Sequence, residues 1–433
     1  MHDDIRPPQR RVKPNTPHQP MHSMRLRGQS LDAAKNRLGT SIPSASAPKI
    51  EDKPIELPEN LSVPEDTTRN KKKRFAWWRG LNRNLRFGII ALLLLVFGVG
   101  AVLYYNHIHP NGDSVLSITK HKAKVVAPAT VPSPLSGLPV SPERAARPVT
   151  GIMIENSDDA RPQSGLQDAG VVYEAIAEGG VTRFLALFQD LAPGYIGPVR
   201  SLRPYYIDYA APFQASIVHV GGSPDALAEV ANGNFRNLDQ FANGGYFTRI
   251  TSRDAPHNVY TNFTNLDKLN QSKGYTTSHF TSWPRKVDKK LATPTAKTIQ
   301  FAISGPDFYD NYTYDPPTNG YLRSEGGAPH LEIVNAGDTN RLQLNPKVVI
   351  ALVVPLGQGA LDASGAYYSN YADTGTGQAY VFEDGGVTVG TWTKADTTSQ
   401  IEFSDSSGQP IKLNAGQTWI TLVSQAGQVT YSP

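Results

Sequence analysis

The stretch VVYEAIAEGGVTRFLALF, residues 171–188, determines the predicted fold. It holds two runs rich in β-branched and aromatic residues, and the pair Gly179-Gly180 separates them. Both central residues of a two-residue hairpin turn adopt a positive φ, which glycine does without strain. The stretch therefore predicts a tight antiparallel hairpin with strands at 171–178 and 181–188.

The loop length predicts which hairpin residues share a face. With a two-residue loop and a regular ladder, the expected pairs are Glu178–Val181, Ile176–Arg183 and Glu174–Leu185. One face then carries the core residues Tyr173, Ala175, Ala177, Phe184, Ala186 and Phe188. The other face places Glu174 and Glu178 diagonally beside Arg183. Two interpretations of these charges stay open: a structural ion-pair cluster, or part of a functional site.

The region around the hairpin interleaves predicted strands and helices. Strands are expected at 148–155 and 215–220, and helices at 205–211, 224–232 and 264–273. After residue 296 the pattern changes to closely spaced short strands separated by turns. The predicted fold class is α+β, with a mixed α/β domain over 148–290 and a smaller, mostly antiparallel β domain over 296–433.

Upstream of these regions, FGIIALLLLVFGVGAVLYY at residues 87–105 is 19 residues long and uncharged. A helix of that length crosses roughly 30 Å of hydrocarbon, so we predict a single transmembrane helix that acts as an uncleaved anchor. Seven Lys and Arg residues lie between Lys71 and Arg86, and none follows the run until Lys120. The positive-inside rule then places the N-terminus in the cytoplasm and the later domains outside.

Charge and composition divide the chain further. The 433 residues carry a net charge of +4, but residues 1–86 are net +9 and the remainder is net −5. The basic tail over 1–86 is expected to be disordered, and 106–147 is expected to be a Pro-rich linker. The basic cluster Lys71–Arg86 should attract anionic lipids of the bilayer, while nucleic-acid binding is the less favoured alternative. The chain has no cysteine, which excludes disulfides, thiol catalysis and a lipidated cysteine.

Several runs carry a family resemblance. They are IMIEN (152–156), ARPQSGL (160–166), YEAIAEGGVTRFLALF (173–188), IGPVRSLRPYYID (196–208), HVGGSP (219–224), PHNVY (256–260), GQAYVFEDG (377–385), GTWTK (390–394) and GQTWITLV (416–423). In these runs the chain resembles the YerB-like family of bacterial surface proteins. The resemblance implies a two-domain extracytoplasmic module and no particular reaction. It also implies a lipidated cysteine as the tether, and this chain has residues 87–105 instead.

The polar residues of these runs are the candidate binding site. We single out Asn156, Arg161, Glu174, Glu178, Arg183, Arg200, Ser201, Arg203, His219, Arg249, His257 and Asn258. Arginine-rich sets suit bidentate capture of phosphate or carboxylate. His219 also precedes a Gly221-Gly222 junction and a helix start, an arrangement that can bind an anion. A packed histidine beside a plain turn is the alternative.

Three hypotheses about function follow. The favoured one is a non-catalytic binding or regulatory module for an anionic wall or lipid ligand or a partner protein. The second is an envelope hydrolase or transferase acting on a glycan or phosphodiester polymer, with Glu174 or Glu178 as acid or base. The third is a structural interaction protein whose charges form only internal ion pairs. The sequence shows no phosphate-loop, zincin, nucleophile-elbow or dinucleotide pattern, and we predict no catalytic residue, metal ligand or cofactor.

Overall fold

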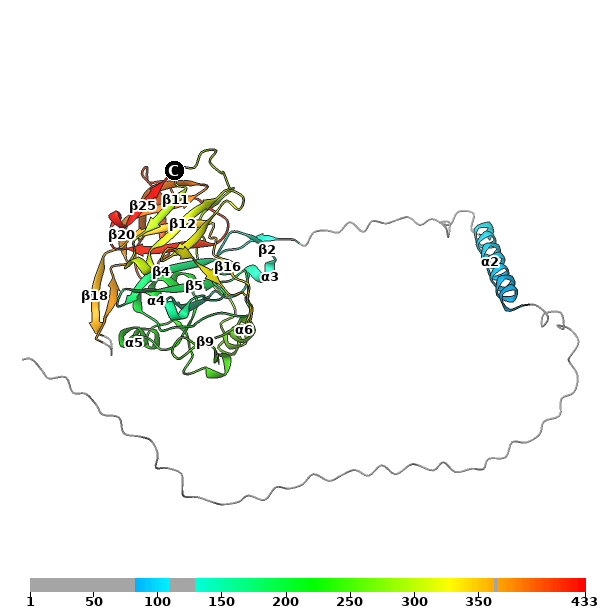
Figure 1. Cartoon of the computed structure of the whole chain (residues 1–433), viewed down its shortest axis with the longest axis horizontal. Helices are drawn as coiled ribbons and strands as arrows, with labels where there is room; N and C mark the ends of the chain where they lie inside the picture. The colour runs from blue at the N-terminus through cyan, green and yellow to red at the C-terminus, as the bar shows by residue number, and fades with distance from the viewer. Residues whose placement is uncertain (1–81, 109–128, 362–364) are drawn as a thin grey trace, which may run out of the picture. The chain divides into compact units, whose positions relative to one another are not determined.

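The computed structural model describes residues 82–108, 129–361 and 365–433 (Figure 1). The chain divides into two compact units, 1–118 and 119–433, and each is described by itself. The predicted disordered tail and most of its basic cluster precede residue 82, so they lie outside the described residues. The same holds for residues 109–128 of the predicted linker.

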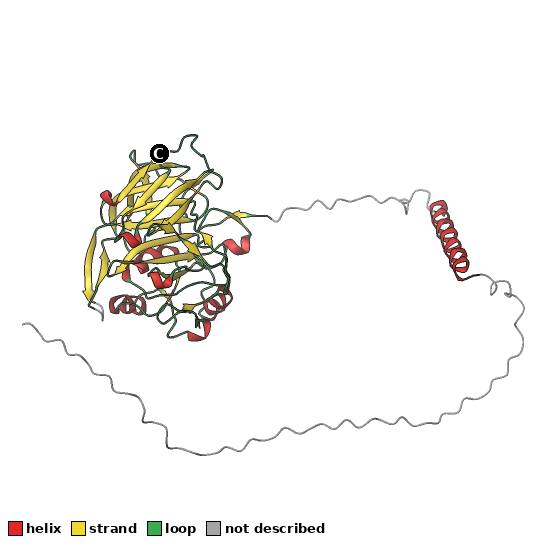
Figure 2. Cartoon of the chain, viewed as in Figure 1, coloured by secondary structure: helices red, strands yellow, loops and turns green. Residues whose placement is uncertain are grey.

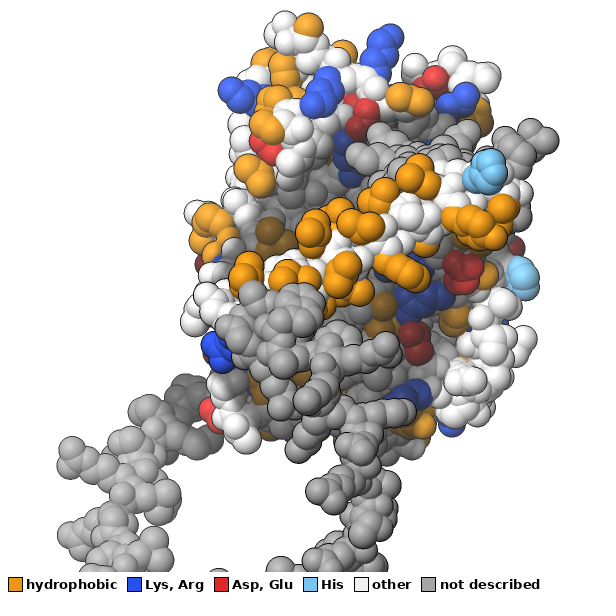
Figure 3. All heavy atoms as spheres, turned by 90° about the vertical axis from the view of Figure 1, so that its right-hand side faces the viewer, with side chains coloured by type: hydrophobic (Ala, Val, Ile, Leu, Met, Phe, Trp, Pro, Cys, Tyr) orange, Lys and Arg blue, Asp and Glu red, His pale blue; other side chains and the backbone are white. Residues whose placement is uncertain are grey.

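The first unit contains one described helix, α2 (Arg83–Ile108), which covers the predicted span at 87–105. It has 26 residues, its most apolar 18-residue stretch has a mean hydropathy of 2.6, and none of its residues is buried. Figure 3 shows hydrophobic side chains along the side of α2 that faces the viewer. By length and composition this helix is able to cross a membrane, and it is the only such helix in the described part of the chain.

The second unit is built on a twelve-stranded mixed sheet (Figure 1). Its main path runs β22-β21-β20-β17-β24-β4-β5-β3-β6-β7, and β18 and β19 attach beside β4. The strands are β3 (Thr150–Glu155), β4 (Val171–Glu178), β5 (Val181–Phe188), β6 (Ser216–His219), β7 (Arg236–Asp239), β17 (Val348–Val353), β18 (Leu356–Leu361), β19 (Tyr367–Tyr371), β20 (Gly375–Glu383), β21 (Gly386–Lys394), β22 (Glu402–Asp405) and β24 (Thr418–Val423).

This sheet takes strands from both predicted domains. The parallel pairing of β24 with β4 joins the strands of 296–433 to those of 148–290, with Trp419 beside Val172. The strand β24 also pairs in parallel with β17, while the pairs β17–β20, β20–β21 and β21–β22 are antiparallel. The strands after residue 296 therefore extend the first region's sheet, in addition to forming a sheet of their own.

A second, five-stranded antiparallel sheet has the order β14-β13-β12-β11-β25. Its strands are β11 (Thr298–Phe301), β12 (Asp310–Asp315), β13 (Gly320–Glu325), β14 (Ala328–Pro329) and β25 (Val429–Ser432). The remaining strands have two residues each: β1 (Val131–Pro132), β2 (Pro139–Val140), β8 (Thr248–Arg249), β9 (Val259–Tyr260), β10 (Arg285–Lys286), β15 (Leu331–Glu332), β16 (Leu342–Gln343) and β23 (Leu413–Asn414).

Two hydrophobic cores cover the two faces of the large sheet. One core includes side chains of helices α4 (Pro204–Ala210) and α5 (Pro224–Asn232), and the other includes helix α6 (Phe263–Ser272) and the five-stranded sheet. A further short helix, α3 (Pro142–Ala145), lies near β1 and β2. Figure 2 shows α4, α5 and α6 in the lower half of the unit and strands dominating its upper half. Burying both faces explains why the hairpin strands are apolar on both sides.

The hairpin confirms the predicted turn and corrects the predicted register. Gly179 and Gly180 have φ of 57° and 84°, and β4 and β5 have the predicted bounds. A β-bulge between Ile176 and Glu178 shifts the ladder, so Glu174 pairs with Phe184 rather than Leu185. Because a shift of one residue turns a side chain to the other face, Glu174 and Glu178 lie on opposite faces of the sheet.

The expected single core face was therefore wrong. Tyr173 and Ala175 pack in one core, whereas Phe184, Ala186 and Phe188 pack in the other. The helix predicted at 224–232 is confirmed as α5. Ser223 has the extended backbone of an N-cap residue, but its side chain makes no capping hydrogen bond.

Candidate functional site

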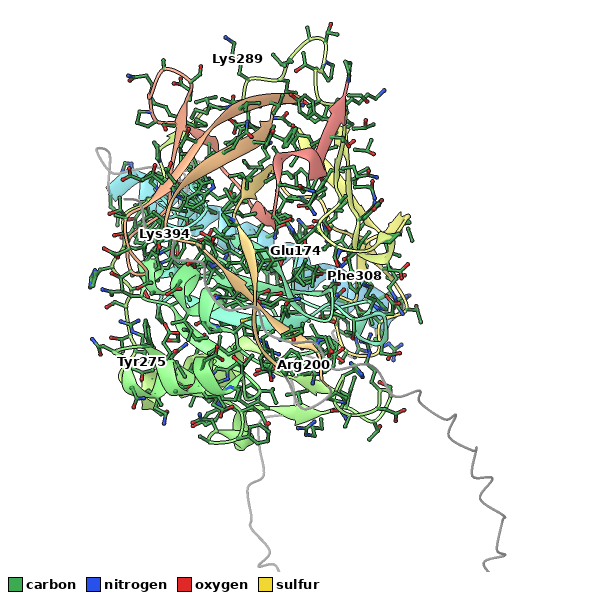
Figure 4. The ribbon with its side chains drawn as sticks, turned by 90° about the vertical axis from the view of Figure 1, so that its left-hand side faces the viewer. Glu174, Arg200, Tyr275, Lys289, Phe308 and Lys394 are labelled. Atoms are coloured by element: carbon green, nitrogen blue, oxygen red, sulfur yellow. The ribbon has the colours of Figure 1, made fainter. Side chains whose placement is uncertain are left out.

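The end of β3 separates two clusters of charged side chains. Glu155 and the next residue, Asn156, point to opposite faces, because side chains alternate along a strand. We call the first set the rim cluster; it consists of Glu155, Glu178, Arg183, Arg200, Arg203 and His257. We call the second the buried cluster; it consists of Glu174, Asp310, Arg323, Glu325 and His330. Figure 4 labels Glu174 near the middle of the unit and Arg200 lower down.

Glu178 is the centre of the rim cluster. Arg183 Nη2 lies 2.7 Å from Glu178 Oε1, and Arg203 Nη2 lies 2.5 Å from Oε2. Burial favours the neutral form of Glu178, but the charges of Arg183 and Arg203 outweigh it and lower the pKa of this carboxyl. Arg203 also packs against the ring of Tyr368 in β19, with 4.6 Å between its guanidinium carbon and the ring centre. These two arginines are therefore occupied within the protein.

Arg200 is the arginine of this cluster with unused donors. Its Nε lies 3.2 Å from Glu155 Oε1, and its side chain is 25% exposed. No described residue accepts a hydrogen bond from its Nη1 or Nη2. Burial lowers the pKa of Arg200, although the charge of Glu155 opposes this shift. Since Arg183, Arg200 and Arg203 face only Glu155 and Glu178, the cluster carries one surplus positive charge.

His257 completes this edge. Its Nδ1 lies 3.0 Å from Glu155 Oε1 and 3.3 Å from Ser157 Oγ. Ser201, which follows Arg200, accepts hydrogen bonds from Arg183 Nη1 at its carbonyl oxygen (3.0 Å) and at Oγ (3.3 Å). The imidazole is one fifth exposed, and its Nε2 lies 3.9 Å from Asp159 Oδ2.

The structure does not bring all predicted binding residues to this edge. Arg249 is exposed and donates to Asn258 Oδ1 (2.8 Å), so these two form a separate pair. His219 is fully buried, and its ring nitrogens contact Gly221 O (2.8 Å) and Asn237 Oδ1 (2.9 Å). The prediction that His219 contributes to an anion site was therefore wrong, and the alternative of a packed histidine holds.

The buried cluster is organised by Arg323. Its Nη2 lies 2.8 Å from Asp310 Oδ1, 3.0 Å from Glu174 Oε2 and 3.5 Å from Glu325 Oε2, and these side chains are at most 2% exposed. Glu174 also accepts a hydrogen bond from Trp419 Nε1 (2.9 Å). Burial raises the pKa of Glu174 well above its usual value, although Arg323 opposes this shift. Glu174 therefore holds the interior together and offers no surface to a substrate.

Three carboxylates of this cluster have the spacing of a cation site. Ligand oxygens of Glu174, Asp310 and Glu325 lie within 4.8 Å of one another. Arg323 contacts all three, so the cation that these oxygens hold in this structure is a guanidinium. A metal ion can bind there only if Arg323 moves away. Among the described residues, no other carboxylate is close enough to pair with the displaced guanidinium.

Asn156 and Arg161 belong to this second side. Asn156 Nδ2 donates to Thr182 Oγ1 (2.6 Å) and to Glu325 Oε1 (2.5 Å). Arg161 Nη2 lies 3.1 Å from Glu325 Oε1, and its Nη1 lies 3.1 Å from Asp158 Oδ1. The predicted set of twelve residues is therefore split between two faces of the sheet and does not form one site.

Sequence reasoning missed Asp310, Arg323, Glu325, His330 and Glu155. One signal was available in β13, where buried positions alternate through Tyr321, Arg323 and Glu325. Charged residues at the inward positions of a strand indicate a buried ion pair.

Comparison with known proteins is consistent with this architecture. Models described as the N-terminal and C-terminal domains of a protein of unknown function (DUF3048) match residues 135–276 and 299–420. The putative lipoprotein YerB of Bacillus subtilis is 30% identical over 265 residues, which cover 60% of this chain and 76% of YerB. The chain belongs to the DUF3048 family.

The solved structure of a DUF3048 relative has the same fold. The crystal structure of YerB from Bacillus subtilis superposes with a TM-score of 0.60 at 25% identity, and the match covers 70% of this chain and all of that one. The resemblance inferred from the sequence runs is thereby confirmed. Since YerB is described as a putative lipoprotein, association of this DUF3048 chain with the membrane or envelope is plausible.

Proposed function

We propose that this protein is a single-pass membrane protein whose extracytoplasmic unit binds an anionic polymer of the cell wall at Arg200. The observation that carries the proposal is the surplus charge of the rim cluster, because Arg200 keeps two donor nitrogens without a partner among the described residues. A guanidinium with free Nη atoms is suited to bidentate capture of phosphate.

The location rests on two separate observations. Helix α2 has the length and composition of a membrane span, and the Lys and Arg residues near it lie on its N-terminal side, with none after it until Lys120. The relative YerB is described as a putative lipoprotein, which is a different way of holding a similar unit at a membrane. We propose that α2 replaces the lipid as the anchor, with the N-terminus in the cytoplasm. The basic residues Lys71–Arg86 then meet anionic lipids of the inner leaflet.

The geometry argues against the enzyme that the sequence suggested. A glycosidase or transferase of that kind needs its acid and base on the two sides of one bond. Glu174 and Glu178 lie on opposite faces of the sheet, and Glu174 is fully buried. For Arg183, Arg203 and Glu178, the hypothesis of internal ion pairs fits, since Glu178 forms an ion pair with each of the two arginines.

The test compares retention of the full-length protein, in a neutral detergent, on purified bacterial walls. One wall sample carries its phosphate-containing polymers, and the other has been stripped of them by acid. We expect Arg200→Ala to weaken retention on intact walls about tenfold, the loss of one charge-assisted contact. The control is Arg144→Ala, which removes an exposed arginine of α3.

Two results overturn the proposal. One is equal retention of the wild type and Arg200→Ala on intact walls. The other is equal retention of the wild type on intact and stripped walls. Binding to vesicles of anionic lipid that Arg200→Ala weakens more than it weakens retention on walls identifies a lipid as the ligand at Arg200 and also refutes a wall polymer.

A further inference from the structure

A pocket opens onto the buried cluster from the side of the sheet opposite the rim cluster. Its volume is about 310 Å³. Its lining includes the charged or titratable residues Arg161, Glu325, His330 and Arg341, together with Pro162, Ala328, Pro329 and Leu331. It shares no residue with the rim cluster, so the inference drawn from it is independent of the function proposed for Arg200.

The hydrogen bonds around His330 fix its protonation. Gln163 Nε2 donates to the carbonyl of Glu155, so Gln163 Oε1 faces His330 Nε2 at 2.9 Å. His330 Nε2 must therefore carry the proton, because Gln163 Oε1 only accepts. His330 Nδ1 accepts from Arg323 Nε at 2.9 Å. The imidazole is neutral, and burial, assisted by Arg323, lowers its pKa well below the usual value.

Glu325 has one satisfied oxygen and one unsatisfied oxygen. Its Oε1 accepts from Asn156 and faces Arg161. Its Oε2 is buried without a hydrogen bond and lies 3.2 Å from His330 Nδ1, whose lone pair is already used by Arg323. Two acceptor atoms at that distance repel each other unless the carboxyl is protonated. Burial raises the pKa of Glu325 to about 7, which agrees with this geometry.

The walls of the pocket are positive. Arg161 packs against the ring of Phe308 at 5.1 Å, and its side chain is about one fifth exposed. Arg341 is exposed and donates only to the backbone carbonyls of Asp338 (2.8 Å) and Asn340 (3.3 Å). Asp158 pairs with Arg161 at 3.1 Å, but no carboxylate of the described residues neutralises Arg341, so the pocket keeps a net positive charge when Glu325 is protonated.

We infer that this pocket binds a tetrahedral oxyanion, such as a phosphate group, between Arg161 and Arg341. Protonation of Glu325, at the floor of the pocket, removes a negative charge that would repel the ligand. A deprotonated Glu325 places a negative charge at the same position. Binding is therefore linked to the proton on Glu325: it is strong below the pKa of this group and weak above it.

All charged groups that face Glu325 are compatible with this linkage. They are Arg161, Arg323, Asp310, Glu174 and His330, with Arg341 across the pocket. Arg323 stays charged throughout, since Asp310 and Glu174 hold its pKa above its usual value although burial opposes this. Glu325 is thus the group whose charge changes near neutral pH.

The test measures sulfate binding to the full-length protein in neutral detergent by titration calorimetry between pH 5.5 and 8.5. Sulfate keeps its charge over this range, so a change in affinity reports on the protein. We expect at least a tenfold loss of wild-type affinity from pH 6 to pH 8. Glu325→Gln imitates the protonated carboxyl and should keep its pH 6 affinity at pH 8.

Arg341→Ala serves as the second variant, because its exposed side chain bonds only to nearby backbone and the fold should be kept. It should weaken sulfate binding about tenfold at pH 6, while Arg144→Ala, which removes an exposed arginine of α3, should leave that binding unchanged. The inference is overturned if Arg341→Ala binds sulfate as tightly as the wild type. It is equally overturned if Glu325→Gln retains the wild-type dependence on pH, or if the wild type binds no sulfate at pH 6.

Discussion

The rim cluster and the buried cluster contain the same kinds of side chain at different depths. In the buried cluster Arg323 has no exposed surface, and every carboxylate around it contacts its guanidinium. In the rim cluster Arg200 is 25% exposed and has donors left over. A fully buried charge without a partner is too costly to persist, whereas water stabilises a surplus charge at the edge. Burial therefore distinguishes the arginines that stabilise the fold through ion pairs from Arg200, which keeps unused hydrogen-bond donors.

The largest expected effect comes from Arg323→Met, which removes the only cation of the buried cluster among the described residues. Glu174, Asp310 and Glu325 are then left facing one another. We expect the free energy of unfolding to fall by about 3–5 kcal/mol, the usual cost of breaking a buried ion pair. Denaturant unfolding followed by tryptophan fluorescence measures this loss. A loss below about 1 kcal/mol contradicts a structural role for this cluster.

A smaller loss is expected for Glu178→Gln in the rim cluster. Its carboxylate is 20% exposed but compensates Arg183 and Arg203, whose side chains are at most 4% exposed. Removing the charge leaves two buried guanidinium groups unpaired, which should lower the free energy of unfolding by roughly 2–3 kcal/mol. If Glu178→Gln is as stable as the wild type, the division of the rim cluster into structural and free arginines is wrong.

The third prediction concerns how the free energy of unfolding depends on pH in the wild type and in Glu325→Gln. The pKa of Glu325 is about 7 in the folded protein, above that of an ordinary glutamate, so the folded state binds the extra proton between about pH 4.5 and pH 7. Stability contributed by this proton is present at low pH and is lost as pH rises through 7, by up to about 1.4 kcal/mol per pH unit. In the Glu325→Gln variant, the free energy of unfolding should not show this part of the decrease with rising pH. An unchanged slope in urea unfolding from pH 5 to pH 7.5 contradicts the assignment.

The smallest effect on stability is expected for Arg200→Ala. Its one ion pair is partly exposed, and such pairs contribute at most about 1 kcal/mol. The midpoint of denaturant unfolding should stay close to that of Arg144→Ala. A loss comparable to that of Glu178→Gln shows instead that Arg200 is a structural residue.

Local signals in the sequence were sufficient for the hairpin turn and most element bounds. The paired glycines predicted the turn, because positive φ is a property of the residues themselves. The bulge that separates Glu174 from Glu178 carries no such signal, since neither neighbour is a glycine or proline. The prediction that Glu174 pairs with Leu185 and lies diagonally beside Arg183 failed for this reason.

The site could not be predicted in full from the sequence, because its residues come from distant parts of the chain that strand pairing brings together. Glu174 and Arg323 are 149 residues apart, and the parallel pairing of β24 with β4 brings the two halves of the chain together. Arg161 and Arg200 were recognised individually, but no local pattern reports that a sheet separates them. The alternation of Arg323 and Glu325 in β13 was the one local clue to the buried cluster.

The most direct test of the account is the side of the membrane on which each part of the chain lies. The chain has no cysteine, so a single introduced cysteine can be labelled without background. Ser407→Cys lies at an exposed turn of the globular unit, and Ser41→Cys lies in the N-terminal tail. With a membrane-impermeant maleimide on intact cells, we predict labelling of Ser407→Cys, and labelling of Ser41→Cys only after lysis. Labelling of Ser41→Cys in intact cells, or protection of Ser407→Cys until lysis, contradicts the account.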